Sequence, residues 1–288
     1  MVKKGTQGLP PPGRHEAGLE GGGMIQEMLI LSAKGLGLMA VMMTLLWAIH
    51  LRLRNAAIVD VGWAAGLGLL ALLYAALGTG SLPHRLLSAC LVAAWSFRLA
   101  WHLYRDRVAN GTPEEGRYVT LRASWGANAS HWFLYFFLGQ GLLNVILAIP
   151  FLLVAFHPGG RLGPVEWGAA CLWLLAIAGE SVADAQLKAF KADPASRGKV
   201  CRRGLWNYSR HPNYFCEWLI WCAYALLATT SPWGWIGWIS PAIILFLLLK
   251  VSGIPPTEKQ ALKSRGAEYR RYQASVNAFF PWFPRRSP

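Results

Sequence analysis

The sequence predicts an all-α polytopic membrane protein with seven transmembrane helices, an external N-terminus and a cytoplasmic C-terminus. Three observations support this prediction. Hydrophobic residues make up 54% of the 288 residues and charged residues only 15%. Apolar runs close to the ~20 residues that a bilayer core requires recur along the chain. Lys and Arg gather in alternate connections between these runs, as the positive-inside rule requires.

The chain divides into a short extension and one membrane domain. Residues 1–24 are rich in Gly, Pro and polar residues and lack an apolar h-region, so we expect disorder rather than a signal peptide. Residues 25–288 form the membrane domain. Seven spans are expected at residues 28–49, 56–77, 82–104, 131–156, 165–183, 213–228 and 233–250. The polar segments 105–130, 184–217 and 252–288 are expected to form one cytosolic mouth.

The net charge of +14 is best explained by membrane orientation. Lys and Arg are abundant after the first, third and fifth spans and in the tail, and scarce in the other loops. This asymmetry places the tail in the cytoplasm. Because the charge is segregated between apolar spans, we do not expect nucleic-acid binding.

The sequence lacks several common metal-binding and nucleotide-binding motifs. The five cysteines form no CxxC pair, and the seven histidines show no zinc-type spacing, so no metal site is expected. There is neither a GxGxxG motif nor a P-loop, so any nucleotide must occupy a non-Rossmann site.

A few polar residues lie inside the apolar spans, where an ionisable group is costly without a partner. Asp60 in the second span and Arg98 in the third are placed to pair across neighbouring helices, either as a structural ion pair or within a substrate site. Gln140 and Asn144, one turn apart, are expected to make interhelical hydrogen bonds in preference to substrate contacts.

Two carboxylates end the fifth span. Glu180 and Asp184 are four residues apart and therefore share one helix face. The sequence leaves three roles open for this pair: acid–base groups, acceptors for ribose or amide groups, or partners of Lys188 and Lys191.

The chain is organised around residues 204–218, GLWNYSRHPNYFCEW. Its polar half follows a basic run and its apolar half opens the sixth span. Pro212 suits the first turn of a helix, where its missing N–H is not needed. Asn213, Glu217 and Trp221 then recur at four-residue spacing and share one face. This polar cluster is not needed for topology, which makes it a candidate functional site.

The pattern Gly-Leu-Trp-x-Tyr-Ser-Arg-His-Pro-Asn-Tyr-Phe-x-Glu resembles the signature of the bacterial DUF1295 membrane proteins, relatives of the steroid 5-alpha-reductases. The resemblance runs from about Asn55 to Trp282. It implies a multi-pass protein of the bacterial inner membrane, surrounded by membrane lipids, with no obligate protein partner. It also implies NADPH-dependent reduction of a carbon–carbon double bond in a lipid-like substrate, a steroid or another enone.

Site residues follow partly from charge and partly from the resemblance. Arginine and lysine at the basic mouth are suited to the phosphates of NADPH: Arg117, Arg122, Lys191, Arg202, Arg203 and Arg210. The resemblance adds further cofactor positions: Asp184, Tyr208, Asn213, Glu217, Trp221, Glu258, Tyr269 and Tyr272. Glu180 and His211 complete the predicted cofactor site. Asp60, Arg98 and Tyr214 are expected to serve catalysis, and Trp95 stands where the steroid enzymes carry a substrate-binding tyrosine.

Two alternatives remain. The shorter core Arg-His-Pro-x-Tyr, with the tail residues Glu258, Tyr269 and Tyr272, is similar to the isoprenylcysteine carboxyl methyltransferases, which implies S-adenosylmethionine. A non-enzymatic lipid-binding or transport protein would explain an apolar cavity but not the polar cluster.

Overall fold

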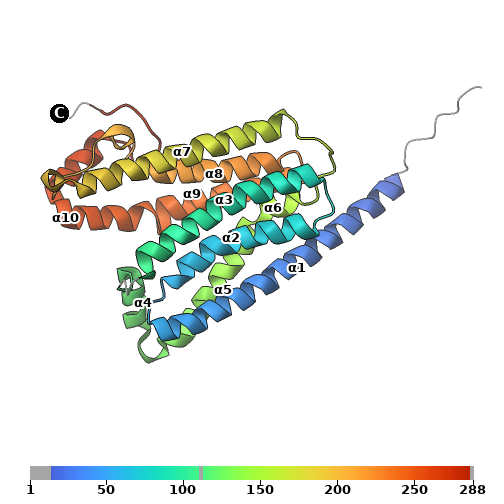
Figure 1. Ribbon diagram of the computed structural model, residues 1–288, viewed down its shortest axis with the longest axis horizontal. Coiled ribbons are helices and arrows are strands. Elements are labelled where there is room, and N and C mark those ends of the chain that lie inside the picture. Colours follow the sequence, from blue (N-terminus) through green and yellow to red (C-terminus); the bar gives the residue numbers. More distant parts are fainter. Residues whose placement is uncertain (1–13, 110–112, 286–288) are drawn as a thin grey trace, which may run out of the picture.

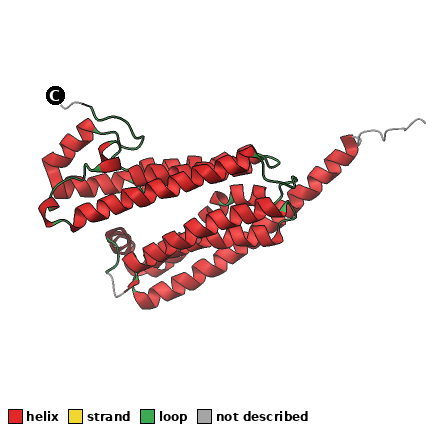
Figure 2. Ribbon diagram, turned by 45° about the horizontal axis from the view of Figure 1, so that its top comes forward, coloured by secondary structure: helices red, strands yellow, loops and turns green. Residues whose placement is uncertain are grey.

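A computed structural model describes residues 14–109 and 113–285, with side chains from residue 22 onward, and this part of the chain is helical without strands (Figures 1 and 2). Its helices are α1 (Arg14–Leu53), α2 (Ile58–Leu77), α3 (Leu82–Arg107), α4 (Gly116–Trp125), α5 (Ala129–Leu147), α6 (Ile149–Val154), α7 (Pro164–Ala192), α8 (Pro212–Ala228), α9 (Ile239–Phe246) and α10 (Ile254–Ser275). Short 3-10 turns precede α5, α8 and α9, and a π-helical turn, Leu247–Val251, follows α9.

The structure confirms a multi-pass membrane protein. Six helical stretches of the described chain are long and apolar enough to cross a bilayer: Gly22–Leu53, Ile58–Leu77, Leu82–Arg107, Gly116–Leu147, Pro164–Ala192 and Gly234–Ser275. Helix α8 has 17 residues and falls short of that length. The predicted count of seven spans and the orientation of the termini are therefore not confirmed.

Three predicted elements differ from the observed ones. The expected span 131–156 is interrupted at Ala148, where α5 ends and α6 begins, because Pro150 lacks the N–H that would continue α5. The expected span 233–250 consists of a 3-10 turn, α9 and the π-helical turn. Helix α1 begins at Arg14, well before the expected span. The predicted disorder of residues 1–13 lies outside the described residues.

The helices form two groups that are joined near one end (Figure 1). Helix α2 packs most extensively on α3, and α1 packs on α5 and α2. In the second group α7 packs along α8, and α8 contacts α9. The short helix α6 contacts both α2 and α8, and α3 also touches α7. The two groups diverge toward the end that carries α4 and α10.

Small residues allow the first group to pack closely. A Cβ on Gly68 would lie 2.6 Å from Ser96 Oγ, and one on Gly66 would lie 2.5 Å from Asn144 Nδ2. Glycine at these positions lets the backbones approach, as is common between membrane helices. The fully buried Asn144 donates to the carbonyl oxygen of Trp63 at 3.0 Å. Its predicted interhelical hydrogen bond is thus confirmed.

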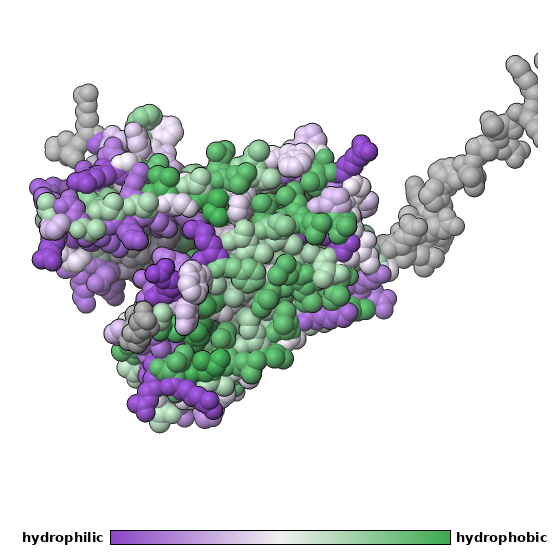
Figure 3. Space-filling model, viewed as in Figure 1, coloured by the Kyte–Doolittle hydropathy of each residue, from purple (hydrophilic) through white to green (hydrophobic). Residues whose placement is uncertain are grey.

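The surface separates apolar from polar regions (Figure 3). Apolar side chains cover the middle of the visible face, and large hydrophobic residues such as Val41, Leu45 and Leu175 are more than half exposed. Such an area is suited to lipid rather than water. Hydrophilic residues gather at the end with α4 and α10, around a hollow in the surface.

Candidate functional site

The first turns of α8 place Glu217 between two tryptophans. One carboxylate oxygen accepts a hydrogen bond from Trp95 Nε1 and the other from Trp221 Nε1, each at 3.0 Å. Trp95 and Trp221 are fully buried and contact each other edge to face, with ring centroids 5.5 Å apart. Because the indoles donate from rigid positions, the carboxylate is held in one orientation.

Helix α7 supplies two further carboxylates on the face that packs against α8. Glu180 Oε2 accepts from Arg98 Nη2 of α3 at 2.8 Å, and Asp184 Oδ1 accepts from Asn213 Nδ2 of α8 at 3.1 Å. The shared face predicted for Glu180 and Asp184 is confirmed by these contacts, which come from two different helices.

Helices α7 and α8 approach each other closely beside these carboxylates. A Cβ on Gly179 would lie 2.8 Å from Cys216 Sγ, so glycine makes room for the thiol. This contact holds the α7 and α8 side chains at a fixed spacing.

We call Arg98, Glu180, Asp184, Asn213 and Glu217 the carboxylate cluster. It holds three acidic groups and one arginine, so acceptors outnumber donors. Asn213 Oδ1 is buried and has no hydrogen-bond partner among the described residues. A buried acceptor without a donor is costly. The cluster therefore has one open buried acceptor among the described residues.

A second polar group ties α10 to the start of α8. Arg210 Nε donates to Glu258 Oε1 at 2.7 Å, and both side chains are largely buried. His211 Nε2 and Tyr269 Oη each lie 3.3 Å from the same oxygen, and Gln273 Nε2 donates to Glu258 Oε2 at 2.7 Å. We call these five residues the tail network. Within this network the Arg210 guanidinium and the Glu258 carboxylate pair with each other.

Three other predicted aromatic residues lie just before α8, in the first turn of α8 and on α10. Tyr214 stacks on His211, and its hydroxyl lies 3.3 Å from Thr257 Oγ1. Buried Tyr272 donates to the carbonyl oxygen of Trp206. Tyr208 is 39% exposed and contacts Phe283 edge to face. Of these three, Tyr208 presents the most surface to a ligand.

Asp60 belongs to a different group of charges, on the α2 and α4 side. Arg107 Nη1 and Arg117 Nη2 each donate to Asp60 Oδ2 at 2.5 Å, and Tyr118 Oη donates to Oδ1 at 2.7 Å. The predicted pairing of Asp60 with Arg98 is wrong. It failed because Arg98 points toward α7, whereas Arg107, more than two turns later, reaches Asp60.

Glu114, which lies just before α4, forms a further ion pair with Arg122. Its carboxylate accepts from Arg122 at 2.7 Å and from the Ala56 N–H at 2.7 Å. Burial by itself raises the pKa of Glu114, but these hydrogen bonds outweigh it and hold the pKa below its usual value near 4.5. The Asp60 group (Asp60, Glu115, Arg107 and Arg117) and the Glu114–Arg122 pair beside it together balance three acidic with three basic side chains. We call these six residues the Asp60 network.

The basic residues predicted for phosphates therefore differ in availability. Arg117, Arg122 and Arg210 are engaged by Asp60, Glu114 and Glu258. Lys191 is exposed and has no ion pair within the described residues. Arg203 is 65% exposed and lies 3.6 Å from Asp193. Lys191 and Arg203, at the end of α7 and in the loop after it, remain open to an anion.

Sequence reasoning missed the hydrogen bond of Trp95. This residue was noted only because it stands where the steroid enzymes carry a substrate-binding tyrosine, yet its indole is the group that links α3 to Glu217. Its spacing of three residues from Arg98 places both on one helix face, which was the available signal.

Comparison with known proteins identifies the family. The family model described as a protein of unknown function, DUF1295, matches residues 46–276, which is most of the chain. The chain belongs to the DUF1295 family. The family predicted from residues 204–218 is thus confirmed, and DUF1295 proteins are known as steroid 5-alpha-reductase-like.

One curated relative of this DUF1295 protein comes from a yeast. An uncharacterized protein of Schizosaccharomyces pombe is 28% identical over 276 residues, which cover 86% of this chain and 78% of the relative. No solved structure matches the chain significantly.

Proposed function

We propose that this DUF1295 protein is an NADPH-dependent membrane reductase that reduces the carbon–carbon double bond of a lipid-like enone. The observation that carries the proposal is the carboxylate cluster, an acceptor-rich group between apolar helices with the unpartnered Asn213 Oδ1. The hydroxyl groups of a ribose and the amide of a nicotinamide are donors of the kind that this cluster lacks.

The residues present fit such a cofactor at both of its ends. Glu180, Asp184, Asn213 and Glu217 would accept hydrogen bonds from ribose and carboxamide groups. Lys191 and Arg203 would neutralise phosphates, because both are exposed cations, one at the end of α7 and one in the loop after it. When bound, NADPH supplies the hydride, since this chemistry belongs to the cofactor.

Within this proposal Arg98 polarises the substrate carbonyl. One of its nitrogens donates to Glu180, and the side chain is 39% exposed. Its remaining N–H groups are therefore free to stabilise negative charge on an oxygen in a site with little water. Trp95 and Trp221 keep Glu217 in place and exclude water from the cluster.

The other two predicted catalytic residues have weaker support. Both oxygens of Asp60 are occupied by arginine and tyrosine donors, which favours a structural role. Tyr214 lies next to the tail network, and its catalytic role stays a prediction. We also propose that the basic end faces the cytoplasm, where NADPH is found.

The test is a thermal-shift titration of the detergent-purified protein with NADPH, NADH and S-adenosylmethionine in parallel. A ligand that binds only the folded protein raises Tm according to the ratio of its concentration to Kd. We expect stabilisation by NADPH, followed by NADPH consumption when enones of increasing size are added. Stabilisation by S-adenosylmethionine alone would assign the chain to methyl transfer and overturn the proposal. Stabilisation by none of the three ligands would also contradict it.

A further inference from the structure

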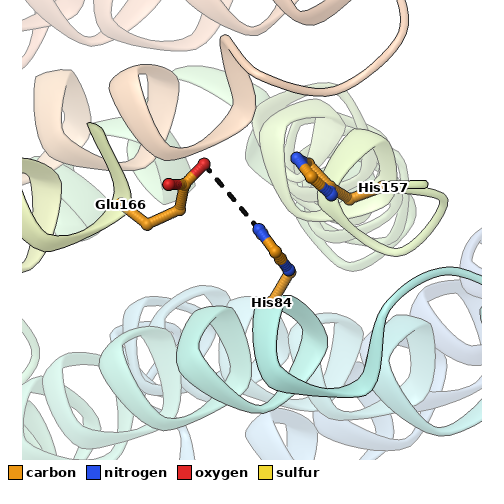
Figure 4. Close-up of side chains that lie close together, drawn as sticks. All are labelled: His84, His157 and Glu166. Carbon is orange, nitrogen blue, oxygen red and sulfur yellow. Dashed lines mark ion pairs between the residues drawn. The ribbon is translucent and has the colours of Figure 1, made fainter. Parts of the chain in front are cut away.

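Three buried side chains meet at the end of the bundle opposite the carboxylate cluster (Figure 4). His84 lies in the first turn of α3, His157 follows α6, and Glu166 lies in the first turn of α7. Their exposed fractions are 1%, 7% and 3%. Glu166 and Asp184 are separated by about 27 Å along α7, at 1.5 Å per residue. This group is therefore separate from the proposed cofactor site.

The three side chains bring their donor atoms close together. One ligand atom of each lies within 4.8 Å of the other two, and His84 Nε2 is 3.7 Å from Glu166 Oε1. Among the described residues His84 Nε2 has no hydrogen-bond partner. A distance of 3.7 Å is too long for a proton to be shared in a hydrogen bond. A cation with bonds of about 2.0–2.1 Å, however, bridges donors up to about 4 Å apart.

Neighbouring groups already orient two of the three donors. Ser81 Oγ lies 2.8 Å from His84 Nδ1. In the tautomer that donates from Nδ1 to Ser81, Nε2 carries the lone pair that a metal takes. Glu166 accepts from the Gly163 N–H at 2.7 Å and from Thr230 Oγ1 at 2.6 Å. Such outer hydrogen bonds fix ligand orientation in metal sites.

His157 has to adjust when the site is filled. Its ring stacks on that of His84, with centroids 3.7 Å apart and planes 11° from parallel. Ring lone pairs lie in the ring plane, so two parallel imidazoles do not point at one ion, and binding requires a tilt of His157. His157 Nδ1 also accepts a hydrogen bond from the Gly159 N–H at 2.9 Å, so binding a metal requires His157 to give up either that hydrogen bond or the proton on Nε2.

We propose that His84, His157 and Glu166 bind a divalent transition-metal ion of the zinc type, which fastens the ends of α3 and α7 to the connection between α6 and α7. Two imidazoles and one carboxylate are a ligand set that Zn²⁺ prefers. Mg²⁺ and Ca²⁺ favour oxygen ligands alone. The sequence spacing predicted no metal site, because the three ligands come from segments far apart in the chain.

The first experiment measures zinc bound by the full chain, purified in detergent without a histidine tag. The protein is stripped with a chelator, dialysed against graded Zn²⁺ and analysed by elemental mass spectrometry. We expect one Zn²⁺ per chain, and at least a 100-fold loss of affinity in His84→Ala and Glu166→Gln. His131→Ala, a change at an exposed histidine, is the matched control and keeps wild-type affinity. Unchanged affinity in both ligand variants, or no bound zinc in the wild type, would overturn the proposal.

A second measurement separates this site from the five cysteines and from misfolding. Co²⁺ bound in place of Zn²⁺ is expected to show ligand-field bands without thiolate charge transfer. A thiolate band would place the metal on cysteine and contradict the proposal. Glu166→Gln is nearly isosteric and its oxygen still accepts one of the two native hydrogen bonds, so it should fold with a Tm only about 2–4 °C below that of the metal-free wild type. Glu217→Gln should bind zinc normally, which makes this test independent of the proposed reductase activity.

Discussion

The carboxylate cluster and the Asp60 network both place charges where polar loops meet apolar helices, yet they are built differently. The Asp60 network matches three acidic with three basic side chains. The carboxylate cluster has three carboxylates and one arginine, and it contains an unpartnered amide oxygen. In the first every acidic side chain pairs with an arginine, whereas in the second only Glu180 does.

Under the proposed function, this difference separates structural charges from binding charges. A balanced network stabilises helix positions, and removing one member leaves a partner uncompensated. An unbalanced cluster costs free energy in the empty protein and recovers it when a ligand supplies donors. The two regions should therefore respond in opposite ways to substitution.

The largest effect is expected at Glu217. Glu217→Gln removes the charge and leaves one indole N–H without an acceptor, so NADPH affinity should fall by about 100-fold, or about 2.7 kcal/mol, while stability falls by only about 1 kcal/mol. Titration calorimetry and Tm measure both quantities. Glu115→Gln, the same change in the Asp60 network, is the control and should keep NADPH affinity.

Asp60 should show the reverse pattern. Asp60→Asn leaves Arg107 and Arg117 without their shared carboxylate, and unfolding should become easier by about 2 kcal/mol, less than for a fully buried pair because these side chains are partly exposed. NADPH affinity should not change. A variant that keeps wild-type Tm but loses turnover would restore Asp60 to the catalytic group and end the distinction between the two regions.

Asn213 tests the unpartnered acceptor directly. Asn213→Leu removes Oδ1, so NADPH should bind about tenfold more weakly, the value of one hydrogen bond near 1.4 kcal/mol. The change also removes the Nδ2 donor to Asp184, so the empty protein should lose about 1 kcal/mol of stability. Equal affinity of the variant and the wild type would show that Oδ1 faces no ligand.

The smallest effect is a pH dependence from Glu114. Its pKa is lower in the folded protein than in the unfolded chain, so its stabilisation is present above the unfolded pKa and is lost as pH falls through the folded value. Tm of the wild type should therefore drop below about pH 5. Glu114→Gln should lack that part of the drop, and a Tm profile identical to the wild type would exclude this contribution.

Local features of the site followed from the sequence. Four-residue spacing placed Asn213, Glu217 and Trp221 on one face of α8, and the structure confirms it through the Trp221 hydrogen bond. The same spacing placed Glu180 and Asp184 together on α7. Helical periodicity is a property of adjacent residues, so such relations need no tertiary information.

Relations between helices did not follow from the sequence. Asp60 was assigned to Arg98, but α3 is rotated so that Arg98 meets Glu180 and Arg107 meets Asp60. Pro150 divided one predicted span, and α8 proved shorter than the other membrane helices. Each outcome depends on the rotation and crossing of packed helices, which local patterns do not encode.

The sequence by itself determined the helical membrane class, the DUF1295 family and the polar start of α8, because composition, signature and periodicity are carried by contiguous residues. Only the tertiary structure decided which charges are paired, which acceptors are left open and which distant side chains meet. His84, His157 and Glu166 show this most clearly: no spacing connects them, and three packed segments bring their donor atoms within 4.8 Å.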